Sequence, residues 1–242
     1  MKTIHWAMIG TGDVTEKKSG PGFYKAKNSV LYGVTNRTLA KAEDYAKRHH
    51  VEKVFASVDD LLADPKVDAV YIATPPGSHK DYALRCAEAG KVCYIEKPIA
   101  LTYNEALEIS EAFKKANVKA FVAYYRRTLP RFTEVKVLLD AGTIGDVRFV
   151  NVAYYRPAAK DEINGTHWHV QPEISGGGIF MDMAVHTLDI LYFFFGAIEK
   201  VAAFRVTQAG YYAPEDNVAL SFAFDNHITG TGHWCFTTDP VA

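Results

Sequence analysis

The first half of the chain alternates short apolar runs with amphipathic stretches, and this alternation restricts the possible folds more than any other feature. The apolar runs are "IHWAMIG", "VLYGVTN", "KVFAS", "VDAVYIATPP", "KVCYIEKP" and "KAFVAYY". Strands that alternate with helices are typical of βαβ units, whose crossover helices make neighbouring strands parallel. We therefore predict an α/β domain with a doubly wound parallel sheet of six strands over residues 1–123.

Capping residues mark where the intervening helices begin and end. Ser57, Ser78 and Thr102 each precede a helical pattern, and Gly90 follows one. Serine and threonine side chains accept hydrogen bonds from the first free N–H groups of a helix, and glycine is favoured just past its end. These positions predict the start of three helices and the end of one.

The second half of the chain has a different pattern. A helix beginning at Pro130 precedes the β-like run "DVRFVNVAYYRP", and three further β-like runs close the chain without helices between them. Strands joined without crossover helices are usually antiparallel. We predict a second, α+β domain over residues 124–242 with a large, mostly antiparallel open sheet. Because the chain stops directly after a strand pattern, we expect this domain to be incomplete and the chain to be a fragment of a longer protein.

Charge and composition exclude several classes of partner. The formal net charge of -1 provides no field to attract nucleic acid or anionic lipid, although the basic pair Arg126-Arg127 could bind a phosphate or a carboxylate. The most apolar segment, "LDILYFFFG", is well short of the roughly 20 residues of a membrane helix. The 3 cysteines lack the spacing of a zinc or redox motif. We expect a cytoplasmic protein with reduced thiols and neither a nucleic-acid nor a membrane partner.

A glycine turn follows the first predicted strand. "GTGDVT" matches two of the three glycines of G-x-G-x-x-G, with Thr15 in the third place. In that motif the first glycine makes the turn, the second admits the pyrophosphate, and the third lets the helix pack closely. The motif predicts dinucleotide contacts at Gly10, Gly12, Asp13 and Val14.

The end of the second strand indicates which dinucleotide binds. A cofactor without a 2′-phosphate usually meets a carboxylate there, but this sequence has Asn36 and Arg37. A guanidinium forms charge-assisted hydrogen bonds with phosphate. We therefore expect NADP to be preferred, with NAD possible, while a solvated surface arginine is the alternative interpretation.

An otherwise apolar helical segment, Gly176 to Gly196, carries Asp182, His186 and Asp189. At 3.6 residues per turn these three side chains share one stripe, and buried charge is costly unless it is paired or opens to a cleft. The stripe is a structural cluster, a metal site or a catalytic acid/base pair. His167 and His169 could add ligands, but histidines at this spacing more often lie at a surface or contact substrate, so we expect no metal.

A lysine stands at the carboxyl end of the fifth strand, in "IEKP". Ligands bind at this edge of open α/β sheets, so Lys97 could polarise or protonate a substrate oxygen. An exposed lysine in an ion pair explains the position equally well.

Four motifs together resemble the Gfo/Idh/MocA oxidoreductases. "GTGDVT", "ATPPGSH", "EKP" and "GGGIFMDMAVHTLD" occur in this chain in the same order as in that family. The resemblance implies an N-terminal Rossmann domain joined to an α/β domain with a large open sheet, which often forms the oligomer interface. It also implies that Lys97, Asp182 and His186 are catalytic. It places further cofactor contacts at Thr74, Pro75, His79, Glu96 and Lys97.

These features predict an oxidoreductase that interconverts a secondary alcohol and a carbonyl on a sugar, polyol or related cyclic compound. His186 would relay the hydroxyl proton, Asp182 would fix its tautomer, and Lys97 would stabilise the substrate oxygen during hydride transfer. Asp189 would orient the helix or a neighbouring loop. We expect substrate contacts from Tyr125, Arg126 and Trp168. The alternative is a sensor or transcriptional regulator that binds the cofactor without turnover. A homo-oligomer, a dimer or tetramer, would form through the open sheet.

Overall fold

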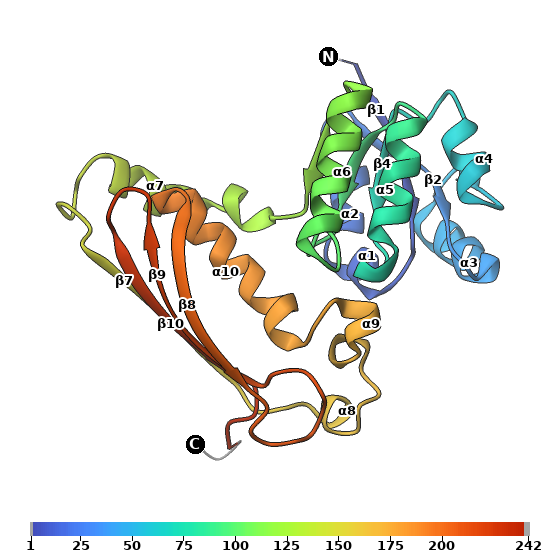
Figure 1. Ribbon diagram of the computed structural model, residues 1–242. Coiled ribbons are helices and arrows are strands. Elements are labelled where there is room, and N and C mark those ends of the chain that lie inside the picture. Colours follow the sequence, from blue (N-terminus) through green and yellow to red (C-terminus); the bar gives the residue numbers. More distant parts are fainter. Residues whose placement is uncertain (1, 240–242) are drawn as a thin grey trace. The chain divides into compact units, whose positions relative to one another are not determined.

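The computed structural model describes residues 2–239, and the chain divides into two compact units, residues 1–123 and 124–242 (Figure 1). Each unit has its own sheet and its own apolar core. The two units are therefore described separately.

The first unit contains a six-stranded sheet in the order β3-β2-β1-β4-β5-β6, and all five strand pairs are parallel. This is the strand order of a doubly wound Rossmann sheet, and it confirms the predicted fold class. Because β1, β4 and β5 are adjacent and parallel, their carboxyl ends lie at the same edge of the sheet. The strands are β1 (Ile4–Ile9), β2 (Ser29–Thr35), β3 (Lys53–Val54), β4 (Ala69–Ile72), β5 (Val92–Ile95) and β6 (Ala120–Val122).

Helices cover both faces of this sheet (Figure 1). One core cluster joins the strands to Leu61, Cys86 and Ile109 of α4, α5 and α6, and the other joins them to Phe23 and Tyr45 of α2 and α3. Burial on both faces explains why the strands read as continuous apolar runs. The helices are α1 (Asp13–Lys17), α2 (Gly20–Lys25), α3 (Leu39–His49), α4 (Val58–Ala63), α5 (His79–Glu88) and α6 (Tyr103–Ala116), with the short turn η1 (Pro76–Ser78) before α5.

The caps agree with the sequence except at Ser78. Ser57 and Thr102 accept hydrogen bonds from the third residues of α4 and α6, and Gly90 has a positive φ of 66° after α5. Ser78 makes no cap, and its hydroxyl instead lies 2.7 Å from Oγ1 of Thr74. The reason is that η1 precedes α5 directly, so Ser78 has a helical backbone rather than the extended one that a cap needs.

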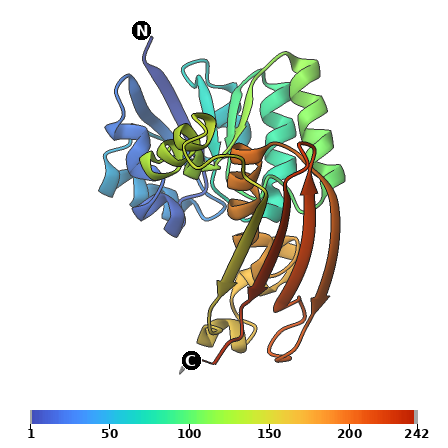
Figure 2. The same cartoon turned by 90° about the vertical axis from the view of Figure 1, so that its left-hand side faces the viewer.

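The second unit contains a four-stranded sheet in the order β7-β10-β9-β8 (Figure 2). The pairs β10–β9 and β9–β8 are antiparallel, and β7–β10 is parallel. The sheet is therefore mixed but mostly antiparallel, as expected. Its strands are β7 (Phe149–Tyr155), β8 (Ile198–Val206), β9 (Asn217–Phe224) and β10 (Thr229–Cys235).

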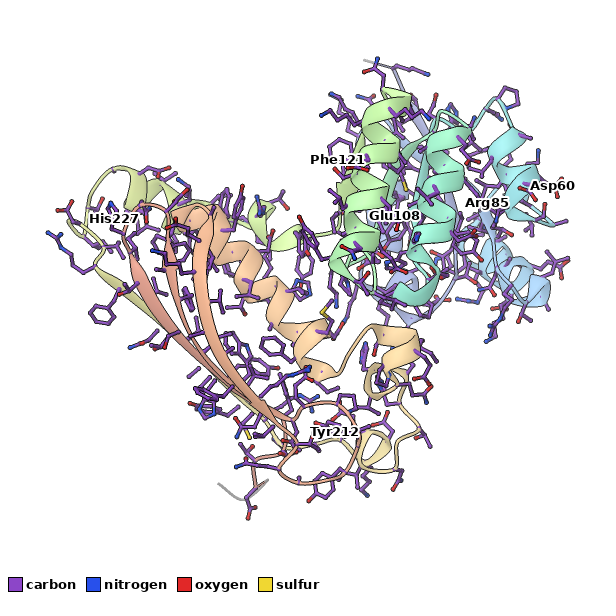
Figure 3. The ribbon with its side chains drawn as sticks, in the orientation of Figure 1. Asp60, Arg85, Glu108, Phe121, Tyr212 and His227 are labelled. Carbon is purple, nitrogen blue, oxygen red and sulfur yellow. The ribbon has the colours of Figure 1, made fainter. Side chains whose placement is uncertain are left out.

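One long helix, α10 (Ile179–Phe195), packs on one face of this sheet. Its apolar side contacts alternate residues of β7, β9 and β10, while the other residues of these strands are exposed on the opposite face. Tyr212, labelled in Figure 3, lies in the loop between β8 and β9 and is buried in the same core. The remaining elements are η2 (Tyr125–Thr128), α7 (Pro130–Asp140), α8 (Lys160–Ile163), η3 (Trp168–Val170) and α9 (Pro172–Ser175).

The segment Pro172–Phe195 is long and apolar enough to cross a membrane, judged by length and composition alone. This segment is longer than the apolar run "LDILYFFFG" discussed above, because it also includes α9 and the glycines before α10. This is weak evidence for a membrane span, because a core helix such as α10 meets the same criterion.

Candidate active site

The glycine turn after β1 has the geometry that a dinucleotide needs. Gly10 has a φ of 95°, and a Cβ there would lie 2.8 Å from the carbonyl oxygen of Ala73. Gly12 is exposed, and nothing lies within 4 Å of the position its Cβ would occupy. Gly10 thus permits the turn, and the space beside Gly12 is open to a ligand, with Asp13 and Val14 starting α1 directly after it.

The close packing expected of the third glycine occurs at Gly20 instead. Thr15 is fully buried, and its Oγ1 donates a hydrogen bond of 2.7 Å to the carbonyl oxygen of Gly12. A Cβ at Gly20 would lie only 1.9 Å from the carbonyl oxygen of Thr15. The Gly-Pro-Gly segment, which reads as poor helix material, begins a second short helix, because Pro21 is well placed in a first turn.

The two residues after β2 take different roles. Asn36 is a loop-forming side chain: its Nδ2 donates to Oγ1 of Thr11 at 2.8 Å, and its Oδ1 accepts from the N–H of Thr38 at 2.9 Å. Arg37 is exposed, as is Lys41 in the first turn of α3. Lys41 is not among the contacts predicted from the sequence, although its place four residues after Arg37 is visible there.

The loop after β4 has a buried histidine at its end. Thr74 is half-buried and Pro75 is exposed, so both reach the surface at the carboxyl edge of the sheet. His79 is fully buried: its Nε2 lies 2.7 Å from the Thr74 carbonyl oxygen and its Nδ1 lies 2.9 Å from that of Pro98. Burial lowers the pKa of His79. His79 therefore joins two loops inside the protein rather than presenting its ring to a cofactor.

The "EKP" motif directly continues β5. The N–H of Glu96 donates to the carbonyl oxygen of Ile72 at 3.0 Å, and the Glu96 carboxylate accepts from the hydroxyl of Tyr71 and from the N–H of Lys97. Lys97 is half-buried, and the Lys97–Pro98 peptide bond is cis. The lysine is thus held at the sheet edge where the sequence predicts it.

Helix α10 carries the polar stripe of the second unit. It begins after Gly178, where a Cβ would lie 2.5 Å from Cβ of Pro214, so glycine lets the β8–β9 loop approach the start of the helix. His186 is buried and meets the ring of Tyr125 edge-on, with 5.4 Å between ring centres. Asp182, one turn earlier, lies with its Oδ1 3.6 Å from Nε2 of His169.

Asp189 has a clear structural partner. Its carboxylate accepts hydrogen bonds from Nε of Arg127 at 2.9 Å and from the guanidinium's Nη2 at 2.5 Å. These hydrogen bonds raise the pKa of Arg127. The pair joins α10 to η2, the turn that also carries Tyr125. The basic pair noted in the sequence does bind a carboxylate through Arg127, and the acid is one of the protein's own residues.

The remaining predicted substrate contacts lie around the same helix. Tyr125 is half-exposed, Arg126 is half-buried, and the ring of Trp168 lies 3.7 Å from that of His169. Within residues 2–239, the structure contains no group of three or more His, Cys, Asp or Glu side chains arranged to hold a metal ion. Cys86 and Cys93 are buried free thiols.

Comparison with known proteins shows two family matches that cover most of the chain. Residues 4–124 match the oxidoreductase family with an NAD-binding Rossmann fold, GFO_IDH_MocA. Residues 132–241 match the GFO/IDH/MocA C-terminal domain. Both matches confirm the resemblance inferred from the four ordered motifs.

Individual relatives are named oxidoreductases and dehydrogenases. The chain is 40% identical over 240 residues to oxidoreductase P35 of Formosa agariphila, covering 96% of this chain and 73% of that protein. It is 33% identical over 201 residues to scyllo-inositol 2-dehydrogenase (NAD(+)) of Bacillus subtilis, covering 80% of this chain and 54% of that protein. These names support the oxidoreductase interpretation and not the sensor.

A solved structure with the same fold is the WlbA dehydrogenase of Chromobacterium violaceum, in complex with NADH and UDP-GlcNAcA. It is 27% identical, with a TM-score of 0.88, over 99% of this chain and 69% of that one. The chain therefore spans between half and three quarters of the length of these relatives.

Proposed function

Because the chain belongs to the Gfo/Idh/MocA family of NAD(P)-binding oxidoreductases, we propose that it interconverts a secondary alcohol and a carbonyl on a sugar, polyol or related cyclic compound, with NADP preferred. The observation that carries the proposal is the polar stripe of α10. His186 is buried one turn after Asp182 on a mostly apolar helix. Burying an imidazole costs desolvation free energy that an apolar side chain would not, whereas an imidazole is well suited to transfer a proton near neutral pH.

The first unit fits a dinucleotide. The open space beside Gly12 and the N–H groups at the start of α1 suit a pyrophosphate, and the half-buried Thr74 and exposed Pro75 suit the nicotinamide half. Arg37 and Lys41 bring two exposed positive charges to the end of β2, where the 2′-phosphate of NADP would bind.

The NADP preference is tested by Arg37→Ala, with dissociation constants measured for NADPH and NADH by fluorescence titration. Loss of a charge-assisted contact of about 1.5–3 kcal/mol weakens NADPH binding about 10- to 100-fold and leaves NADH binding nearly unchanged. Equal losses for both cofactors would refute the preference.

When bound, the nicotinamide supplies C4 as the donor or acceptor of the hydride. The residues of the chain transfer the proton of the substrate hydroxyl and stabilise the charge on the substrate oxygen. His186 takes the proton of the substrate hydroxyl in oxidation and returns it in reduction, and Asp182 holds the imidazole in one tautomer and supports its charged form. The ammonium of Lys97 donates a hydrogen bond to the substrate oxygen and stabilises negative charge on it. Tyr125, Arg126 and Trp168 bind the remaining hydroxyl groups of the substrate.

The exposed face of the second sheet is suited to a homo-oligomer. Its residues on β7, β9 and β10 are small, polar uncharged or aromatic, and Phe204 of β8, which is 81% exposed, pairs with Ala219 on this face. A sheet face without carboxylates or lysines on β7, β9 and β10 favours packing against a second copy of the chain. The neutral composition and free thiols suit the cytoplasm.

The activity is tested by following NADPH and NADH absorbance over a panel of sugars, polyols and their oxidised forms. His186→Ala is expected to lower kcat by about 10²- to 10⁴-fold while cofactor binding stays intact, because general acid–base catalysis contributes that much. His5→Ala, which removes a partly exposed imidazole from β1, is the control and keeps full activity. Full activity in His186→Ala would overturn the mechanism.

A further inference from the structure

We propose that Tyr71 and His79 are positioning residues for Lys97, and this inference rests on the catalytic role proposed for that lysine. Lys97 is the middle residue of Glu96–Lys97–Pro98. Each of its two neighbours is held by a fully buried side chain, Glu96 by Tyr71 of β4 and Pro98 by His79 at the start of α5. The segment that carries the lysine is therefore fixed on both sides by fully buried groups.

The first contact fixes Glu96. Tyr71 lies in β4, next to β5, and none of its surface is exposed. Its hydroxyl donates a hydrogen bond to Oε1 of Glu96, and Oε2 of the same carboxylate accepts from the N–H of Lys97 at 3.3 Å. The carboxylate thus joins a core tyrosine to the main chain of the lysine itself.

The Tyr71 hydroxyl also contacts the segment that follows the glycine turn. It lies 2.7 Å from Oγ of Ser19, which donates to the carbonyl oxygen of Val14 at 3.1 Å. Val14 is in α1, directly after the glycine turn. Tyr71 therefore lies between α1 and the segment that carries Lys97, while Ser19 keeps its own hydrogen bond to Val14 when the phenol is removed.

The second contact fixes Pro98. His79 begins α5 and is fully buried, with Nδ1 at 2.9 Å from the Pro98 carbonyl oxygen and Nε2 at 2.7 Å from that of Thr74. One imidazole thus spans the loop after β4 and the loop after β5. Either neutral tautomer donates to one of these carbonyls, so the ring always bonds at least one of the two loops.

A buried tyrosine hydroxyl and a buried imidazole are expensive to desolvate, and apolar residues of similar size would fill the core without that cost. Their partners explain why polar groups are present: both bond the segment that carries Lys97. Loss of either contact lets the lysine shift, and misplacement by about 1 Å costs about 100-fold in rate for a positioned catalytic group.

The test compares Tyr71→Phe and His79→Gln with Tyr32→Phe in the full chain. Tyr32 is the matched control, because its hydroxyl also donates to a carboxylate, that of Asp64 at 3.3 Å, in the same unit but away from Lys97. The measurements are kcat on a substrate found in the panel, the dissociation constant for NADPH, and the rate of reductive methylation of Lys97 followed by peptide mass spectrometry.

Tyr71→Phe and His79→Gln are expected to lower kcat about 10- to 100-fold, to change NADPH binding less than threefold, and to raise the methylation rate of Lys97 at least twofold. Tyr32→Phe should change none of these values. Wild-type kcat and methylation rates in both variants would refute the positioning role. If one variant does not fold, as judged by thermal unfolding, the other carries the test.

Lys97→Met separates this inference from the proposed function. If Lys97→Met keeps full activity, the catalytic role of the lysine is wrong and the positioning proposal falls with it. If Lys97→Met is inactive but both positioning variants have wild-type kcat, the proposed function stands and only the present inference is refuted.

Discussion

The ion pair between Asp189 and Arg127 offers a measurable test of how the second unit holds its polar helix. In Asp189→Asn the volume stays the same, but the guanidinium loses a bidentate charged partner. The Asp189 side chain is 7% exposed and that of Arg127 is 35% exposed. Breaking a fully buried pair costs about 3–5 kcal/mol, and the exposed third of Arg127 recovers part of its hydration, so we expect a loss of about 2–3 kcal/mol.

The assay is thermal unfolding of the full chain, followed by circular dichroism. A loss of that size lowers Tm by about 5–10 °C for a chain of this length, since each kcal/mol shifts Tm by about 2–4 °C. The matched control is Asp146→Asn, because the Asp146–Arg148 pair is 82% and 78% exposed. Exposed pairs contribute about 0–1 kcal/mol, so Tm of the control should barely change.

The double variant Asp189→Leu with Arg127→Met tests whether the cost of Asp189→Asn comes from the unpaired charge of Arg127. If most of the cost in Asp189→Asn comes from an unpaired, partly buried charge, removing both partners should restore part of the lost Tm. An unchanged Tm in Asp189→Asn would show that the pair contributes nothing. A double variant less stable than Asp189→Asn would show that hydrogen-bond geometry, rather than charge, is what the pair supplies.

Three further predictions concern other parts of the chain. Gly10→Ala should weaken NADPH binding at least tenfold in fluorescence titration, since its φ of 95° and the Ala73 carbonyl oxygen exclude a side chain, and wild-type binding would contradict this. The hydrogen bonds of Glu16 to Arg48, and more weakly to His49, lower the pKa of Glu16 from 4.5 to about 2, so its contribution to stability is present above pH 4.5 and lost as the pH falls to 2. Urea unfolding of Glu16→Gln should therefore show a deficit of about 1 kcal/mol at pH 7 that shrinks below pH 4.5, and an equal deficit at pH 3 and pH 7 would refute the assignment. If the proposed homo-oligomer forms through the exposed face of β9, Ala219→Arg should lower the mass in light scattering to that of a monomer, whereas an unchanged oligomeric mass would exclude this face as the interface.

The order of elements in the first unit was predictable because it depends on local signals. Apolar runs buried on both faces, separated by helical periodicity, predict parallel strands without knowledge of any contact, and all six strands were found. The turn at Gly10 belongs to the same class, because a positive φ next to a strand needs glycine whatever surrounds it. The stripe on α10 was likewise visible, since helical spacing alone aligns residues 182, 186 and 189.

The partners of those residues were not predictable, because each is set by packing between segments distant in the chain. Asp189 is bonded to Arg127, 62 residues earlier, and the hydroxyl of Tyr71 meets Glu96 and Ser19 from two other elements. No periodicity encodes such pairs.

The sequence by itself determined the succession of strands and helices in the first unit, the glycine turn and the candidate acids and bases, because these follow from local periodicity and backbone sterics. Only the tertiary structure decided what each polar group does. In the structure the close backbone contact expected at Thr15 occurs at Gly20. His79 lies buried between two loops, and Asp189 pairs with Arg127. The physical reason is that a hydrogen bond depends on the position and direction of two atoms, and those are fixed only when the core has packed.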